Sequence, residues 1–333
     1  MSIRGFLRLS AHIQLMPVLE SGEETLVGGQ AVIEGVMMRA PHSYCVAVRK
    51  PGGGIVTQEM AVPRMSEKYP AFKLPVLRGL GTIGQAMSLG FKALKFSADV
   101  AIEEENAKGS EAKAQPSKAK ETSSWALALN LIFSLGFFIF LYKLVPLYLV
   151  SSLEKVYPVI HNRILFNGLD GVIRIVIFLG FLALISRWKD VHRVFEYHGA
   201  EHKVVFNYES GQAVNVANAQ AFTTYHPRCG TSFLMVVMVI SMLVYMLIPA
   251  DTFAVKMAVR IAMLPVIAGL SYEMIRFAAK RRGSFMALLT TPGLWLQRIT
   301  TQPPSDDQAE IAIHALNRAM ALESEQGGEL VIA

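Results

Sequence analysis

Four long apolar stretches constrain the fold of this chain more than any other feature of its sequence. They cover residues 125–150, 171–186, 232–249 and about 253–272. A membrane-crossing helix needs about 20 apolar residues, so the first and fourth are long enough; the other two would span only tightly, and the second could be a buried core helix. With 52% hydrophobic and only 17% charged residues, the chain has little polar surface for a soluble protein. We therefore predict an α-helical integral membrane protein with about four transmembrane helices.

The distribution of Lys and Arg predicts the orientation of these helices. Basic residues gather in the first 125 residues, in the 187–230 loop and beyond Glu273, and they are sparse in the connections 151–170 and 250–256. Because positive residues favour the cytoplasmic side, both termini and the 187–230 loop are expected to be cytoplasmic. The net charge of +6 then indicates attraction to anionic membrane lipids. No nucleic-acid-binding motif accompanies the charge, and no nucleic-acid partner is expected.

A small cytoplasmic β module is predicted at residues 26–62, before the first apolar stretch. The runs SYCVAVRK and IVTQEM are β-rich and are separated by PGGG, which is typical of a hairpin turn. Glu34 and Arg39, just before them, are either solvated strand residues or members of a polar site. Cys45 is expected to be a small buried hydrophobe. Since Cys45 and Cys229 both fall in segments assigned to the reducing cytoplasm, no disulfide is expected.

The other segments are assigned from composition and periodicity. Residues 1–25 lack the features of a signal peptide and are expected to form an N-terminal tail. Glycine-rich, basic residues 63–101 suit an amphipathic helix on the membrane surface, with a fifth span as the alternative, and their small residues would suit a homodimer. The remaining segments are a disordered linker at 102–123, transmembrane helices 1 and 2 at 124–186, a cytoplasmic loop at 187–231, transmembrane helices 3 and 4 at 232–275, and a juxtamembrane segment with a C-terminal cytoplasmic helix at 276–333.

The C-terminal helix has a recognisable start and an apolar face. Ser305 and Gln308 have the spacing of a capping box. One face of the helix then carries the apolar residues Ala309, Ile313, Leu316 and Met320. Such a stripe needs a partner, which we expect to be the β module or another cytoplasmic helix.

The interval YHGAEHKVVFNYE, residues 197–209, concentrates residues that can bind metal. If it is helical, His198 and His202 lie on one face with Glu201 beside them. Two histidines at this spacing can hold one metal ion, and the order His-x-x-Glu-His matches the inverted zincin motif, where the glutamate is the general base. Glu209 is either a reserve ligand or a residue that orients a histidine. The five-residue pattern alone is weak, because short motifs recur by chance.

A second cluster, HPRCGTS at 226–232, increases the weight of the first. His226 and Cys229 have a spacing suited to a metal knuckle, and imidazole together with thiolate favours zinc over magnesium or calcium. Three alternatives remain open. The histidines could be ordinary interfacial residues, or His198, His202, His226 and Cys229 could fill a closed structural zinc site. Cys229 could also be a nucleophile that works with a histidine base and no metal.

The motifs GGQAVIEGVMMR, YHGAEHK and HPRCGTSFL resemble the signature stretches of the YqhQ-like family, which comprises bacterial multi-pass membrane proteins of unknown function. The resemblance runs from about Gly28 to the C-terminal helix and includes GLWLQRITTQPPSDDQ; residues 1–25 and 102–123 fall outside it. Members are described as predicted metal-dependent enzymes, which implies no particular reaction. The resemblance implies residence in the bacterial cytoplasmic (inner) membrane.

Together these features predict a zinc site at the cytoplasmic edge of the membrane. If the protein is an enzyme, we expect a metal-dependent hydrolase that acts on a membrane-embedded peptide or lipid-linked substrate, with Glu201 as general base. Glu273, at the end of the fourth stretch, is a further candidate, although snorkelling explains it equally well. The alternative is a non-catalytic membrane assembly or partner-binding factor with a structural zinc site.

Overall fold

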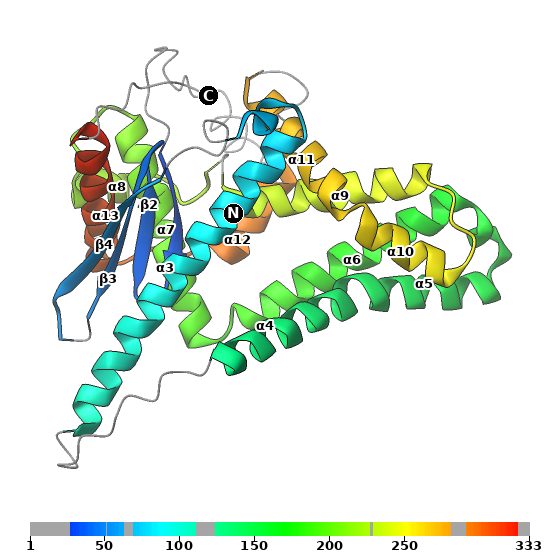
Figure 1. Cartoon of the computed structure of the whole chain (residues 1–333), viewed down its shortest axis with the longest axis horizontal. Coiled ribbons are helices and arrows are strands. Elements are labelled where there is room, and N and C mark those ends of the chain that lie inside the picture. The colour runs from blue at the N-terminus through cyan, green and yellow to red at the C-terminus, as the bar shows by residue number, and fades with distance from the viewer. Residues whose placement is uncertain are drawn as a thin grey trace.

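The computed structural model describes residues 27–50, 52–62, 69–110, 124–226, 229–280 and 291–325. The fold is mostly helical, with one small antiparallel sheet. Figure 1 shows the sheet at one end of the molecule, next to α7, α8 and α13, while the apolar helices α4–α6, α9 and α10 extend away from it. The predicted tail at 1–25 and residues 111–123 of the predicted linker lie outside the described residues.

The sheet has four strands in sequence order, each antiparallel to the next. The strands are β1 (Gly28–Val32), β2 (Gly35–Arg39), β3 (Ser43–Arg49) and β4 (Ile55–Ala61). The predicted hairpin is confirmed: β3 pairs with β4, and Val48 lies opposite Val56. The turn between them contains Gly53 at φ 93°, a backbone conformation that favours glycine.

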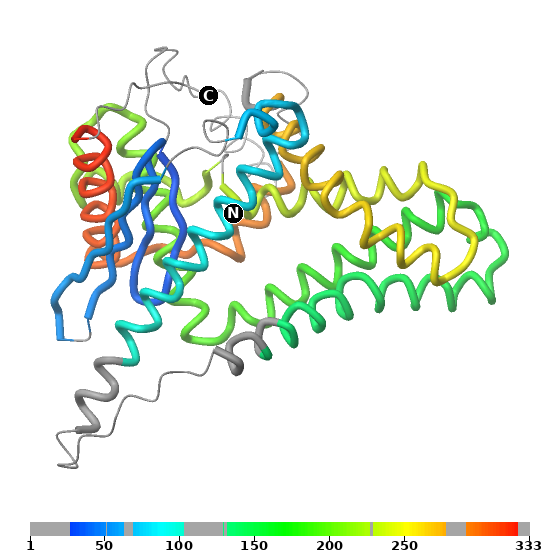
Figure 2. Tube along the Cα trace, in the orientation of Figure 1, coloured from blue at the N-terminus to red at the C-terminus, as the bar shows by residue number. Residues whose placement is uncertain are grey.

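Helices cover both faces of the sheet. Because side chains alternate along a strand, Val36 and Met38 pack on one face against α7 (Lys189–Glu209) and α13 (Asp306–Glu325). Met37 packs on the other face against α3 (Leu77–Ser110). Figure 2 shows α13, in red, beside the sheet, in blue, although the two are separated by most of the chain. Cys45 is buried and free, as predicted for a small hydrophobe, and Cys229 is free as well.

The helix α3 differs from its prediction in length and surroundings. It continues to Ser110, so residues 102–110 of the predicted linker are helical. Two of its glycines make close contacts within the chain: a Cβ on Gly79 would lie 2.8 Å from Tyr272, and one on Gly90 would lie 2.3 Å from the Gln30 amide oxygen. Contacts within the chain therefore explain why glycine occupies these two positions. The homodimer stays a prediction.

Three helical stretches in the described part of the chain are long and apolar enough to cross a membrane, or four if a bent pair counts as one span. The stretches are 132–156, 163–185 and 230–247, and the bent pair is 253–262 with 264–277. The elements that form them are α4 (Ser124–Ile139), the π-helical turn η2 (Phe140–Leu144), α5 (Val145–Val156), α6 (Arg163–Ile185), α9 (Gly230–Leu247), α10 (Phe253–Ala262) and α11 (Leu264–Lys280). Two short 3-10 turns lie outside these stretches: η1 (Pro70–Lys73) precedes α3, and η3 (Pro158–His161) connects α5 to α6.

Two prolines account for the irregularities in these helices. Pro146 lacks an amide hydrogen and follows directly on the π-helical turn in the first stretch. The fourth stretch was predicted as one span, but it is bent by 49° between α10 and α11. Pro265 lies in the first turn of α11, where its ring clashes with the carbonyl four residues earlier and breaks the helix.

The last elements are α8 (Val216–Ala221), α12 (Thr291–Thr300) and α13. The predicted capping box at the start of α13 is confirmed, since the Ser305 amide donates to Oε1 of Gln308 at 2.9 Å. The predicted apolar stripe of α13 packs against the sheet and α7, with Ala309 and Leu316 fully buried. Residues 281–290 and 326–333 of the predicted 276–333 segment lie outside the described residues.

Candidate metal centre

The helix α7 positions His198, Glu201 and His202 on one face, as their spacing predicts. Three residues separate this helix from the end of the apolar helix α6. A Cβ on Gly199 would lie 2.0 Å from the carbonyl oxygen of Gln302, so only glycine permits this approach of the chain that leads to α13. The Gln302 amide donates to the carbonyl of Phe195 at 2.9 Å and fixes that contact.

Cys229 reaches the same point from the start of another apolar helix. It is the N-cap residue of α9, and its sulfur accepts from the amide of Thr231 at 3.4 Å. The Thr231 hydroxyl lies 3.1 Å from the same sulfur. A helix N-terminus favours negative charge, so this position suits a thiolate.

Three of the four predicted ligands converge. One ligand atom from each of His198, His202 and Cys229 lies within 4.8 Å of the other two. Nε2 of His198 is 3.2 Å from Sγ of Cys229, and the centroids of the two imidazole rings are 4.5 Å apart. We call these three residues the His–Cys site.

Backbone carbonyls orient both imidazoles. Nδ1 of His198 donates to the carbonyl of Thr300 at 2.8 Å, and Nδ1 of His202 donates to the carbonyl of Thr224. With Nδ1 protonated, Nε2 of a neutral ring carries the lone pair, and in both residues this atom faces the shared centre. Histidines that ligate metals are usually held in this way. Nε2 of His202 is buried and makes no hydrogen bond of acceptable geometry.

The site is also electrostatically suited to a thiolate. Burial alone would raise the pKa of the Cys229 thiol, but His202 and His198 together lower this pKa well below its usual value. Burial opposes the charged form of His202, yet Cys229 and then Glu201 outweigh it and raise the pKa of His202 to about 9. In the absence of a metal ion, the site therefore favours a thiolate beside an imidazolium. The thiolate is the form of cysteine that binds metals.

Glu201 lies beside the ligand atoms and not among them. Its Oε2 is 3.4 Å from Nε2 of His202, and its side chain is buried. A Cβ on Gly29 of β1 would lie 2.6 Å from Cγ of Glu201, so a glycine in the sheet makes room for this carboxylate. Both residues line a cavity of about 130 Å³ together with the His–Cys site and His226. At about 30 Å³ per water, that space holds a few water molecules or one small functional group.

His226 lies next to the His–Cys site, beside Glu209. Its ring centroid is 5.6 Å from that of His202, and its Nε2 is 3.6 Å from Oε2 of Glu209. Glu209 contacts a histidine and lies outside the convergent ligand group, and both of its predicted roles stay predictions. His226 is not in the group of convergent ligand atoms found among the described residues.

Gln297 of α12 is a supporting residue that the sequence did not indicate. It is fully buried, its Oε1 accepts from the amide of His226 at 2.7 Å, and its Nε2 donates to the carbonyl of the same residue at 2.8 Å. Its Nε2 also donates to Ser232 Oγ at 3.0 Å, which connects the loop before Cys229 to α9. A glutamine in the otherwise apolar run GLWLQRIT is the signal that could have identified it.

The remaining sequence candidates contact other side chains away from the cavity. Glu34, at φ 53° in the β1–β2 turn, pairs with Arg193 of α7 and joins the sheet to this helix. Arg39 donates to the Gln85 amide oxygen at 2.9 Å. Glu273 pairs with Arg78 and joins α11 to α3, so it has a structural partner and does not line the cavity.

Comparison with known proteins places the chain in a family. The family model described as "Protein of unknown function (DUF1385)" matches residues 74–322. The chain is 33% identical over 302 residues to "Uncharacterized protein YqhQ" of Bacillus subtilis (strain 168), and this match covers 89% of the chain and 93% of that protein. No solved structure matches the protein. The match confirms the resemblance found in the motifs: the chain belongs to the DUF1385 family of proteins of unknown function, to which it is similar from α3 to α13.

Proposed function

We propose that the protein spans the cytoplasmic membrane of a bacterium, with the sheet and the His–Cys site on the cytoplasmic side. Its apolar helices support this proposal, because only 22%, 22% and 28% of their most apolar windows are buried inside the protein. The rest of that surface needs an apolar environment. The distribution of Lys and Arg supports the orientation.

We further propose that His198, His202 and Cys229 bind one zinc ion. Two imidazoles with Nε2 directed inward and one thiolate are a donor set that suits zinc. The position of Nε2 of His202 supports it too, since this buried atom faces Cys229 and Glu201.

The reaction class that this arrangement supports best is hydrolysis. Three protein ligands leave a fourth position, and catalytic zinc sites keep such a position open. A zinc ion held by these three residues would polarise a scissile carbonyl or phosphoryl group as a Lewis acid. Glu201 would take a proton from the attacking water and pass it to the leaving group. The observation that carries the proposal is the Glu201 carboxylate, which is buried at the cavity 3.4 Å from a ligand nitrogen.

The position of the site favours a membrane-embedded peptide or a lipid-linked molecule as substrate. Cys229 directly precedes α9 and lines the cavity together with Gly230, so the cavity lies beside one end of an apolar helix. The cavity of about 130 Å³ has room for a reacting group only, and the rest of the substrate would lie outside it. Such a substrate would reach the cavity from the surrounding membrane lipids.

The test combines metal analysis with a charge-removing substitution. Elemental analysis of the detergent-purified protein should give one zinc per chain, and X-ray absorption should show two nitrogens and one sulfur from the protein with a non-protein fourth ligand. Glu201→Gln should keep zinc and its ligand shell. It should also abolish cleavage of the peptide or lipid-linked substrate once one is found, whereas Glu196→Gln, on the same helix and away from the cavity, should keep it. A protein without zinc, or a Glu201→Gln variant with full activity, would refute the proposed mechanism.

A structural zinc site is the second candidate, and the position of His226 favours it. His226 lines the same cavity, and a ring rotation toward His202 would complete a shell of three nitrogens and one sulfur. In that case X-ray absorption would show no non-protein ligand. Glu201→Gln would then be nearly silent, while His198→Ala would unfold the region around the sheet. The protein would serve membrane assembly or partner binding, without catalysis.

A further inference from the structure

A second group of buried polar residues lies among the apolar helices, between their middle and the end away from the His–Cys site. The aromatic ring of Tyr245 is surrounded by three cations: Arg260 at 5.0 Å, Arg174 at 5.5 Å and Lys143 at 5.6 Å from its centroid. All three cationic side chains are buried. Charged groups at this depth in a membrane helix are costly and usually mark a ligand or ion pathway.

One buried carboxylate faces these cations. Asp170 forms an ion pair with Arg174, and its Oδ2 is also 3.2 Å from a guanidinium nitrogen of Arg260. Lys143 donates to the hydroxyl of Tyr245 at 3.3 Å. In the part of the chain that the structure describes, three buried cations thus share one buried anion. The cluster carries an excess of positive charge.

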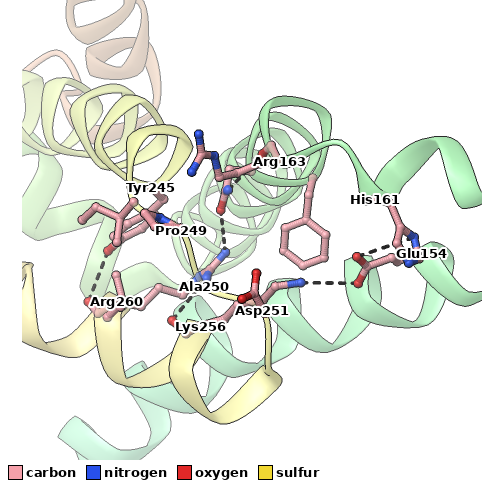
Figure 3. A pocket seen from close by; sticks show the side chains of 13 residues that line it. Glu154, His161, Arg163, Tyr245, Pro249, Ala250, Asp251, Lys256 and Arg260 are labelled. Carbon is pink, nitrogen blue, oxygen red and sulfur yellow. Dashed lines mark hydrogen bonds and ion pairs between the residues drawn. The ribbon is translucent and has the colours of Figure 1, made fainter.

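A cavity of about 470 Å³ opens onto this cluster, between the η3–α6 and α9–α10 connections (Figure 3). Arg260, Lys256, Arg163 and His161 are the basic residues that line it. We call it the cation cavity. It lies at the ends of α6 and α9 that are remote from Trp188 and Cys229, so the two sites are at opposite ends of these helices.

The acidic residues of the cation cavity do not cancel its charge. Glu154 is already engaged, with Lys256 Nζ at 3.4 Å and His161 Nδ1 at 3.8 Å from its carboxylate (Figure 3). Asp251 is exposed at the rim. Arg260 uses its terminal nitrogens for Asn167, at 3.1 Å, and Asp170, whereas its Nε is buried with no hydrogen-bond partner. The guanidinium charge of Arg260 is balanced by one carboxylate, which it shares with Arg174.

We propose that the cation cavity binds a phosphate group. Guanidinium groups match phosphate oxygens in geometry and charge, and a phosphate with two negative charges would balance the excess. The cavity lies at the ends of the apolar helices α6 and α9; in a membrane that these helices span, their ends would lie near the lipid phosphates, and basic pockets between such helices bind lipid headgroups. Its volume accommodates more than an isolated carboxylate needs. The site is separate from the proposed zinc site, and the inference does not depend on it.

The test is isothermal titration calorimetry on the full-length protein in a non-ionic detergent, with three probes. Dihexanoyl phosphatidic acid should bind saturably, one per chain. If inorganic phosphate binds as tightly, the site takes a free phosphate; if only the phosphatidic acid binds, the site takes a lipid headgroup. Both results support a phosphate site. Hexanoate that binds as tightly as the phosphatidic acid, or failure of both phosphate probes to bind, would overturn the proposal.

Substitutions of the basic residues test whether the phosphate probes bind in the cation cavity. Arg260→Gln should weaken phosphate binding by about tenfold or more, because it removes a buried charged donor. Since this variant could also fail to fold, Arg163→Gln and Lys256→Gln at the cavity rim provide a second test, each with about a two- to fivefold loss. Arg187→Gln, at the opposite end of α6, is the matched control and should bind as the natural protein does. If both rim variants match this control, the probes bind elsewhere and the proposal is wrong.

Discussion

At the His–Cys site the polar side chains are held by backbone carbonyls, whereas in the cation cavity they are held by one another. Thr300 and Thr224 accept from the imidazoles and leave Nε2 lone pairs directed inward. At the inner side of the cation cavity, Arg260, which lines it, shares the carboxylate of Asp170 with Arg174, which does not. The first arrangement offers acceptors to a cation, and the second offers donors to an anion.

The difference shows how one helical framework can hold two sites of opposite preference. The ends of α6 and α9 bring each set together from segments that are distant in the sequence. At one end the loop after α8 and the last residue of α12 supply backbone carbonyls; at the other end the side chains of η2, α6 and α10 supply the charges.

The largest effect is expected from removal of a ligand. His198→Ala should lower zinc affinity more than about 100-fold, because changes in groups that merely support a ligand already cost about 10- to 100-fold. His192→Ala is the control, since His192 is exposed on the same helix. Competition with a chromophoric chelator measures both affinities. Equal affinities in the two variants would show that the His–Cys site does not bind the metal.

A large effect on stability is expected in the cation cavity. Asp170→Asn leaves Arg174 and Arg260 without their shared carboxylate and should destabilise the protein by about 3–5 kcal/mol. The same change should tighten phosphate binding, because it raises the excess of positive charge. Thermal unfolding in detergent, with and without phosphate, measures both effects, and Asp190→Asn, at an exposed position of α7, is the control. A variant that loses stability and phosphate binding together would show that the cluster serves structure alone.

An intermediate effect is expected at Gln297. Gln297→Leu leaves the amide and carbonyl of His226 and the hydroxyl of Ser232 without their buried partner. We expect a loss of about 2–3 kcal/mol in the free energy of unfolding. Gln212→Leu, at an exposed position, should change it by less than about 0.5 kcal/mol. If the Gln297 variant kept its stability, the hydrogen bonds of Gln297 would not be what holds the loop before Cys229 at the His–Cys site.

Features that depend on local pattern could be predicted from the sequence. The β3–β4 hairpin follows from two β-rich runs around PGGG, and the capping box from the spacing of Ser305 and Gln308. The convergence of His198 and His202 follows from the helical period. The break at Pro265 had a local signal as well, although the fourth apolar stretch was predicted as continuous.

Features that depend on distant contacts could not be predicted in the same way. Thr224 and Thr300 act through backbone carbonyls, which every residue has, so nothing in their side chains marks the role. Lys143, Arg174 and Arg260 each stand in a different apolar stretch and look like isolated exceptions until the helices bring them to Tyr245. A charge inside an apolar stretch was the available signal, and three such signals together identify the cation cavity.

The smallest effect is expected in a polar cluster that belongs to neither site. Glu323 of α13 accepts from the amide of His42 at 2.9 Å and from the hydroxyl of Ser43 at 2.8 Å, and its other oxygen is 2.9 Å from the His42 ring. Burial would raise the pKa of Glu323, but the hydrogen bonds from His42 and Ser43 lower it below the usual value. A carboxyl whose folded pKa is lowered stabilises the protein above the unfolded pKa of about 4.3, and this contribution is lost as the pH falls through the folded pKa.

Glu323→Gln should therefore cost about 1 kcal/mol at pH 7, and the difference from the natural protein should shrink as the pH falls below about 4.3. Thermal unfolding in detergent between about pH 3.5 and 7.5 measures this, with Glu325→Gln, at an exposed position of the same helix, as the control. Zinc affinity and phosphate binding should stay unchanged in both variants, because the cluster joins α13 to the β2–β3 turn and touches neither site. A change in either affinity would mean that the sheet region and the two sites are coupled, and the contrast between independent cation and anion sites would have to be abandoned.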